Sequence, residues 1–191
     1  MVERLRLIFD AFWERAERKL LMLISNDDRV RVLRRKGIRI GENCLIYTTF
    51  FSTEPYLVEI GNHVAVSSGT SFVTHDATGW LFADHPNMDI FGRIQVGDNT
   101  YFGTDCTIMP GARIGSNCVI GSGTVVRGVI PDGSVVMGNP ARVIMKTALL
   151  KALLVHHKHR LETRSLPRKE KERVLRRHFG LAEPQTGGPG A

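Results

Sequence analysis

Proton-transfer groups gather around one irregular part of the sequence, residues 77–93, which holds a proline, two glycines and three aromatic residues. His75 stands at the root of this segment, between Thr74 and Asp76. An imidazole titrates near neutral pH, so it is suited to taking a proton from a hydroxyl group. His75 is therefore the predicted general base, and His85, within the segment, is the second candidate.

A catalytic imidazole needs a hydrogen-bond acceptor on its other ring nitrogen, which fixes the tautomer that faces the substrate. Asp76 is adjacent in sequence, and Glu54, Asp84 or a backbone carbonyl are the alternatives. Trp80 offers either a surface for a sugar ring or packing against a neighbouring subunit. Glu54, Trp80 and Asp84 are accordingly the predicted substrate contacts, and Asp76 joins the two histidines as a candidate catalytic group.

The elements that position these groups are set by a repeat of six residues. Six large apolar residues recur at that spacing: Val96, Phe102, Ile108, Ile114, Ile120 and Val126. Of the six residues that lie four positions after each of these, five are small. Neither an α-helix nor a flat strand has this period. The repeat predicts a parallel β-helix over residues 38–145, with residues 77–93 extruded as a loop.

Charge divides the chain into the same regions. The net formal charges of residues 1–37, 38–145 and 146–191 are +4, −4 and +7. Apolar spacings of three and four predict a helical segment over 1–37, with a stripe that includes Leu20 and Leu23. Helices are also expected from about 147 to 164 and from Arg168 to His178 within a C-terminal helical segment, 146–180, ahead of a flexible tail, 181–191. The cysteines, all on the small interior positions, are expected to be buried fillers: Cys44, Cys106 and Cys118.

Several stretches of this repeat resemble a known family. They are Ile94–Gly103, Ile108–Gly115, Val119–Val126, the closing Gly138-Asn-Pro-Ala-Arg and the His-bearing segment Phe72–Asp76. Together they are similar to the left-handed β-helix hexapeptide-repeat acyltransferases, nearest to the galactoside, maltose, polysaccharide and xenobiotic acetyltransferases. The resemblance covers about residues 38–145 and implies a mainly β fold with α-helices at both ends.

The resemblance also implies a homotrimer with acetyl-CoA bound between subunits. A histidine at the loop root, matched by His75, takes the proton of the acceptor hydroxyl, which attacks the thioester directly. The backbone near Gly103 and Thr104 stabilises the oxyanion, and main-chain groups around Ser122 meet the pantetheine arm. Basic residues meet the phosphates of the coenzyme. Arg142 matches the arginine of the family's closing motif, and Arg127 and Lys146 are candidates at positions shifted from the family's other basic residues.

The expected function is acetyl-CoA-dependent O-acetylation of a sugar hydroxyl, of a cell-surface polysaccharide or its precursor. N-acylation of a nucleotide amino-sugar, serine acetylation and a non-catalytic β-helix scaffold are the alternatives. A metal hydrolyase of the γ-carbonic-anhydrase type needs three converging histidines, two of them five apart. His63, His75 and His85 lie twelve and ten apart, so no metal is expected.

The basic flanks admit other partners. Neither an export signal nor a membrane span is predicted, because charged residues interrupt every apolar run near the N-terminus. The expectation is a cytoplasmic protein that binds no nucleic acid. Solvated helix faces are the favoured explanation of the basic terminal helices, and contact with a membrane surface is the less favoured one.

Overall fold

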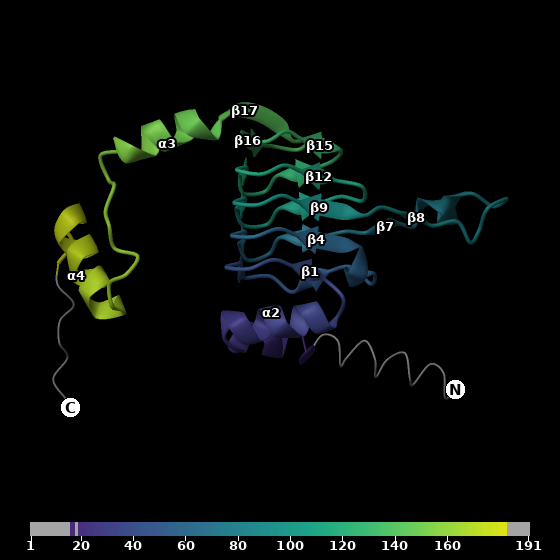
Figure 1. Ribbon diagram of the computed structural model, residues 1–191, viewed down its shortest axis with the longest axis horizontal. Helices are drawn as coiled ribbons and strands as arrows, with labels where there is room; N and C mark the ends of the chain where they lie inside the picture. The colour runs from purple at the N-terminus through teal and green to yellow at the C-terminus, as the bar shows by residue number, and fades with distance from the viewer. Residues whose placement is uncertain (1–15, 18, 183–191) are drawn as a thin grey trace. The chain divides into compact units, whose positions relative to one another are not determined.

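The computed structural model describes residues 16, 17 and 19–182. The chain divides into two compact units, residues 1–151 and 152–191. The first unit contains a three-sided parallel β-helix whose short strands stack coil upon coil (Figure 1). The β-helix predicted from the six-residue repeat is confirmed.

Three sheets form the walls of the β-helix. Wall A contains β1 (Arg39–Ile40), β4 (Val58–Ile60), β9 (Ile94–Val96), β12 (Arg113–Ile114) and β15 (Val129–Ile130). Wall B contains β2 (Leu45–Ile46), β5 (Ala65–Val66), β10 (Tyr101–Phe102), β13 (Val119–Ile120) and β16 (Ser134–Met137), with β17 (Arg142–Lys146) antiparallel to β16. Wall C contains β3 (Phe50–Phe51), β6 (Ser71–Phe72), β11 (Thr107–Ile108) and β14 (Val125–Val126). The turns between these walls are the A–B, B–C and C–A corners.

The core of the β-helix is a column of apolar side chains. Successive coils pair in register, so that Phe72, Ile108 and Val126 stack inside wall C. Such burial removes apolar surface from water and is the main favourable contribution to folding. The fully buried members of the column are Ile46, Val58, Val66, Phe72, Ile94, Phe102, Ile108, Ile120, Val126 and Val136.

Small residues occupy the tight interior positions just before each strand. The three cysteines are buried and unpaired, as predicted, and burial raises the pKa of each thiol. Buried threonines satisfy their hydroxyls on the backbone of the coil, as where Thr70 Oγ1 donates to Gly103 O at 2.9 Å. The hydroxyls of Thr48, Thr70, Thr100 and Thr124 are paired in this way, so these residues fill the interior without the cost of an unpaired polar group.

The A–B corners turn through left-handed backbone conformations. Asn43, His63, Asn99 and Asn117 have φ between 53° and 58°, and asparagine is among the residues that tolerate this region best. Their side chains form a ladder along the corner: Asn99 Nδ2 donates to Asn117 Oδ1 at 2.7 Å, and His63 Nδ1 lies 2.8 Å from Asn99 Oδ1. His63 therefore belongs to the corner.

Helices close the N-terminal end of the β-helix. Residues 16, 17 and 19–23 are helical, and α2 (Asn26–Arg35) lies below the first coil (Figure 1). The expected stripe is wrong in its described part: Leu20 and Leu23 are exposed, and Leu21 is buried instead. The helix end is tied to the β-helix through Arg29, a buried residue of α2 whose Nε donates to Leu21 O and whose Nη1 donates to Ile46 O, both at 2.7 Å. The remainder of the predicted stripe lies outside the described residues.

The irregular segment forms an arm that projects from the C–A corner (Figure 1). Its base is a two-stranded antiparallel ladder of β7 (His75–Asp76) and β8 (Ile90–Phe91), in which His75 pairs with Phe91. A single turn of 3-10 helix, η2 (Thr78–Leu81), follows β7, and another, η1 (Pro55–Leu57), occupies the C–A corner of the preceding coil. Gly92 N donates to Thr74 O at 2.8 Å where the chain rejoins the coil.

Beyond the last coil, β17 leads into α3 (Thr147–Val155), and the second unit contains α4 (Arg168–Phe179). The first C-terminal helix is shorter than expected, ending at Val155 rather than near residue 164. The backbone turns directly after Val155, with His157 N donating to Leu154 O at 3.2 Å. None of the helices in the described part of the chain has the length and apolar character needed to cross a bilayer.

Candidate active site

His75 lies at the base of the arm and contacts a carboxylate from the coil below. Its Nδ1 is 3.0 Å from Glu54 Oε2, and the side chains of the two residues are 32% and 16% exposed. Ser52 Oγ lies 3.2 Å from the same nitrogen, and the ring of Phe91 packs at 5.9 Å between centroids. The imidazole is thus held on one side and still reachable from solvent.

The β-helix itself brings the two residues together. β3 pairs with β6 so that Phe51 faces Phe72, and Glu54 and His75 each lie three residues beyond that pair. They therefore occupy equivalent places on the C–A corner of two successive coils. A glutamate 21 residues before the histidine in sequence becomes its direct neighbour because one coil here takes 21 residues.

Threonine hydroxyls hold Glu54 in its ionised form. Thr53 Oγ1 donates to Glu54 Oε1 at 2.6 Å, and Thr74 Oγ1 donates to Oε2 at 2.8 Å. These hydrogen bonds, with that from Thr53 foremost, and the contact with His75 lower the pKa of the Glu54 carboxyl below its ordinary value, although partial burial opposes them. An ionised carboxylate only accepts hydrogen bonds, so His75 Nδ1 carries a proton, and in the neutral imidazole Nε2 presents the lone pair. That is the tautomer required of a base.

Asp76 is adjacent to His75 in sequence, but its side chain bonds to the first turn of the arm. Its carboxylate accepts hydrogen bonds from the backbone N–H and the hydroxyl of Thr78, which stabilise the first turn of the arm. These bonds lower the pKa of the Asp76 carboxyl, with a smaller contribution from the charge of Arg127. Among the predicted carboxylates, the one that contacts the His75 ring nitrogen is therefore Glu54.

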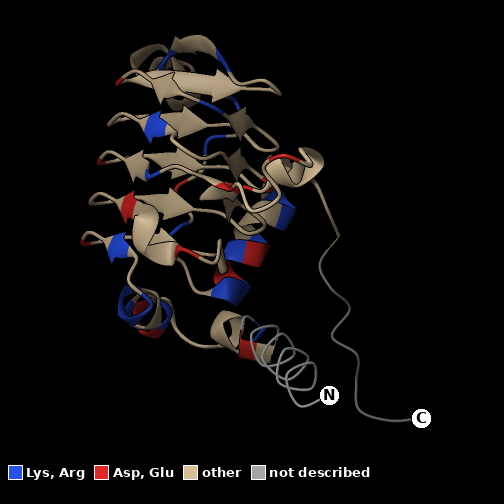
Figure 2. Cartoon of the chain, turned by 90° about the vertical axis from the view of Figure 1, so that its right-hand side faces the viewer, with Lys and Arg blue, Asp and Glu red and all other residues tan. Residues whose placement is uncertain are grey.

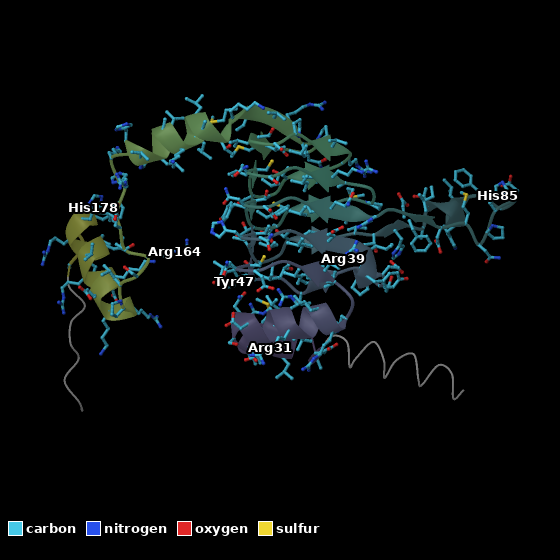
Figure 3. The ribbon with its side chains drawn as sticks, in the orientation of Figure 1. Arg31, Arg39, Tyr47, His85, Arg164 and His178 are labelled. Carbon is cyan, nitrogen blue, oxygen red and sulfur yellow. The ribbon has the colours of Figure 1, made fainter. Side chains whose placement is uncertain are left out.

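The remaining predicted arm residues lie away from His75 in this chain. His85 is at the far end of the arm (Figure 3). Its Nε2 is 3.6 Å from Asp84 Oδ2, and both side chains are mostly exposed. Trp80 is 86% exposed. The arm thus presents His85, Asp84 and Trp80 outward, where a neighbouring molecule can meet them, and one chain alone does not bring them to the Glu54–His75 pair.

The predicted backbone site lies at another corner of the β-helix. Gly103, Thr104 and Ser122 belong to the B–C corner, since they follow strands of wall B and precede strands of wall C. The Gly103 N–H donates to Ile120 O at 2.8 Å within the coil. The Thr104 N–H donates to Ser122 Oγ at 3.2 Å, and rotation of that exposed hydroxyl group would release it. Of the two amides, that of Thr104 is the one available to a substrate.

The basic candidates are exposed near the C-terminal end of the β-helix. Arg142 and Lys146 are the first and last residues of β17. Arg127 lies at the C–A corner, the corner that also carries His75. Over the described ranges, no group of three or more His, Cys, Asp or Glu side chains gathers as a metal ion would require.

Sequence reasoning missed three supports of the site, Ser52 and the hydroxyls of Thr53 and Thr74. A signal for all three was present, because Ser52-Thr53-Glu54 follows Phe51 as Val73-Thr74-His75 follows Phe72. Counting residues from the paired inward phenylalanines would have aligned them. Asp76 was predicted to be catalytic instead because it is adjacent to His75 in sequence.

Comparison with known proteins agrees with this architecture. Residues 93–128 match the family described as Bacterial transferase hexapeptide (six repeats). Protein CapG of Staphylococcus aureus is 35% identical over 130 residues, which are 66% of this chain and 74% of that protein. A putative acetyltransferase of Bacillus subtilis, YvoF, is 31% identical over 90 residues; the match spans 47% of this chain and about half, 48%, of YvoF.

Solved structures with the same fold include two sugar acetyltransferases. A maltose O-acetyltransferase from Clostridium difficile 630 has a TM-score of 0.51 and 26% identity, over 73% of this chain and 87% of its own. A galactoside acetyltransferase in complex with coenzyme A has a TM-score of 0.53 and 20% identity, over 78% of this chain and 88% of its own, a likeness of fold alone. With the repeat, the three-walled coil and the extent of the CapG match, these findings show that the chain belongs to the left-handed β-helix hexapeptide-repeat acyltransferases.

Proposed function

We propose that the protein transfers the acetyl group of acetyl-CoA to a sugar hydroxyl, of a cell-surface polysaccharide or its precursor, with His75 as general base. The observation that carries the proposal is the 3.0 Å contact between Glu54 Oε2 and His75 Nδ1, which leaves Nε2 free on a partly exposed imidazole. The likeness to a maltose O-acetyltransferase supports a sugar hydroxyl as the acceptor. The same base would serve an amino-sugar or serine acceptor.

The proposed reaction is a direct transfer. His75 Nε2 takes the proton of the acceptor hydroxyl as its oxygen attacks the thioester carbonyl carbon, and the imidazolium that forms is stabilised by the Glu54 carboxylate. The oxyanion accepts a hydrogen bond from the Thr104 N–H. The carbon–sulfur bond then breaks, and the thiolate takes the proton from the imidazolium. Products are the acetyl ester and free coenzyme A, and the base is restored.

The proposed donor site combines backbone amides with positive charge. The exposed Ser122 hydroxyl and the Thr104 amide can hydrogen-bond the amide-rich pantetheine arm. Arg142 and Lys146 are free to reach phosphates, since both side chains are exposed on β17. A flat wall cannot enclose such a ligand by itself, so a groove between two copies is the natural site.

The placement of the two corners supports a homotrimer. His75 is at the C–A corner and Thr104 at the B–C corner, so the base and the proposed oxyanion donor meet only when one copy faces another. A threefold assembly places unlike surfaces opposite each other and closes on itself. The arm, with Trp80, Asp84 and His85, then extends over the neighbouring copy, where these residues are proposed to contact the acceptor.

The chemistry of the walls supports the same arrangement. Outward positions of wall A carry charge, with Arg39, Glu59 and Arg113 among them, and the charged segments are visible in Figure 2. Outward positions of β2, β5, β10 and β13 in wall B carry none; they are Leu45, Ala65, Tyr101 and Val119. Outward positions of wall C are uncharged too; they are Phe50, Ser71, Thr107 and Val125. Uncharged walls suit the interior of an interface and charged walls suit solvent, so walls B and C are the proposed contact surfaces.

The proposal is tested by titrating acetyl-CoA and coenzyme A calorimetrically and then following free-thiol release with a panel of acceptors. Sugars, nucleotide amino-sugars and serine are compared at equal concentration. We expect coenzyme A to bind and thiol release to be fastest with a sugar hydroxyl. Faster thiol release with an amino-sugar or serine would show that this compound, and not a sugar hydroxyl, is the acceptor. Absence of coenzyme A binding would favour the alternative of a non-catalytic β-helix scaffold.

A further inference from the structure

The helix that follows the last coil carries an apolar face of four leucines. Leu149 and Leu153 are four residues apart, as are Leu150 and Leu154, and these two rows adjoin on one side of α3. Lys151 lies at the edge of this face, three residues before Leu154. Leu149, Leu153 and Leu154 are 53%, 54% and 56% exposed, so the described chain leaves this leucine face largely uncovered.

Positive charge surrounds the leucine face along the chain. Residues 146–182 contain eleven Lys and Arg and three Glu, a net formal charge of +8. Lys146 and Lys151 bracket the first half of α3, and Lys158 and Arg160 follow it closely. Two helices in this region expose basic side chains, Lys151 on α3 and Lys169, Lys171 and Arg177 on α4. An exposed apolar helix with basic residues before and after it along the chain can bind a membrane surface, because buried apolar area and attraction to anionic lipids both contribute to such binding.

We propose that α3 and the basic residues of segment 146–182 bind the surface of an anionic membrane. The leucines enter the boundary between headgroups and acyl chains, and the lysines and arginines meet lipid phosphates. Exposure of the leucine face reverses the preference drawn from the sequence, in which the basic helices were expected to be merely solvated. The proposal stands apart from the acetyltransferase activity, because it concerns binding alone.

Two other partners fit the observations less well. A soluble polyanion would use the positive charge and leave the leucines in water. Pairing of this segment with the same segment of a second copy would bring together two regions of net charge +8, and like charges repel. An anionic bilayer is the partner that uses both the apolar and the charged features of this segment. An acceptor sugar attached to a membrane lipid would then be met at the surface that holds the enzyme.

Co-sedimentation of the full chain with lipid vesicles tests the proposal. Vesicles of phosphatidylcholine alone are compared with an equimolar mixture of phosphatidylglycerol and phosphatidylcholine. We expect binding to the mixture only, weakened at about 1 M salt, where the Debye length falls to about 3 Å from about 10 Å at 0.1 M. The triple variant Leu149→Gln, Leu153→Gln, Leu154→Gln is expected to bind at least about tenfold more weakly.

A matched control keeps the test specific. Val129→Gln replaces an apolar side chain that is 69% exposed on wall A, and it is expected to bind vesicles as the parent does. Circular dichroism checks that both variants fold. Absence of parent binding to phosphatidylglycerol vesicles overturns the proposal, and so does equal binding by the triple variant, which would indicate charge alone. A change of oligomeric mass in the triple variant, measured by light scattering, would assign the leucine face to a second copy.

Discussion

Replacing Glu54 by glutamine removes the charge beside His75 and keeps the shape of the side chain. The carbonyl oxygen of the new amide can still accept from His75 Nδ1, and the amide can face Thr53 Oγ1, so the tautomer is retained. A hydrogen bond to a charged group contributes about 1.5–3 kcal/mol and a neutral one about 0.5–1.5 kcal/mol. The loss of about 1–1.5 kcal/mol in stabilisation of the imidazolium corresponds to a fall of roughly tenfold in kcat.

Steady-state thiol release from acetyl-CoA measures this effect. The KM of each substrate is expected to stay within about twofold, because Glu54 acts through His75 and its effect appears in the transition state. Glu59→Gln is the matched control: Glu59 is also a partly buried glutamate whose pKa is lowered, by Arg93 first, but it pairs with Arg39 and Arg93 on wall A. If Glu54→Gln and Glu59→Gln reduced kcat equally, or if Glu54→Gln left it within about twofold, the positioning role of Glu54 would be refuted.

Three further predictions concern stability and reactivity. Because the pKa of Glu54 is lowered on folding, its contribution to stability is present above its unfolded pKa, near 4.5, and is lost as pH falls through the folded value; the urea midpoints of the parent and Glu54→Gln should therefore converge on acidification. Arg29→Met leaves buried carbonyls without donors and should reduce the free energy of unfolding by about 2–4 kcal/mol, against less than about 0.5 kcal/mol for the exposed Arg31→Met. Cys106 is buried and its pKa is raised, so its thiol should resist alkylation at pH 8, about half a unit below the ordinary thiol pKa, until urea unfolds the chain. Alkylation of Cys106 in the folded chain would contradict its buried position.

The β-helix could be predicted from sequence because its determinants are local and repeated. Val96, Phe102 and Ile108 each lie inside the coil, as their spacing of six requires. No comparable repeat predicts the packing of the helical segments at the two ends of the β-helix. Leu20 and Leu23 fit a helical stripe, yet Leu21 is the buried residue, and its carbonyl accepts a hydrogen bond from the buried Arg29. A tertiary contact of this kind leaves no periodic trace in the sequence.

The candidate site was predictable in part. His75 follows from its residue type and its place at the start of the irregular segment. Its contact with Glu54 depends on the number of residues in one coil, and that number becomes evident once Phe51 and Phe72 are paired. The proposed relation of His75 to Thr104 depends on a second copy of the chain, because the two residues lie on different corners of one copy. A pattern within a single sequence carries no signal for that relation.

The role of His75 is tested most directly by comparing the parent with His75→Ala in coenzyme A binding and in the rate of acetyl transfer to the best acceptor. A positioned general base contributes about 10² to 10⁴ in rate. We predict unchanged affinity for coenzyme A and a fall of at least about 10² in kcat for the variant. Turnover within about threefold of the parent, at unchanged affinity, would contradict the assignment of His75 as the base.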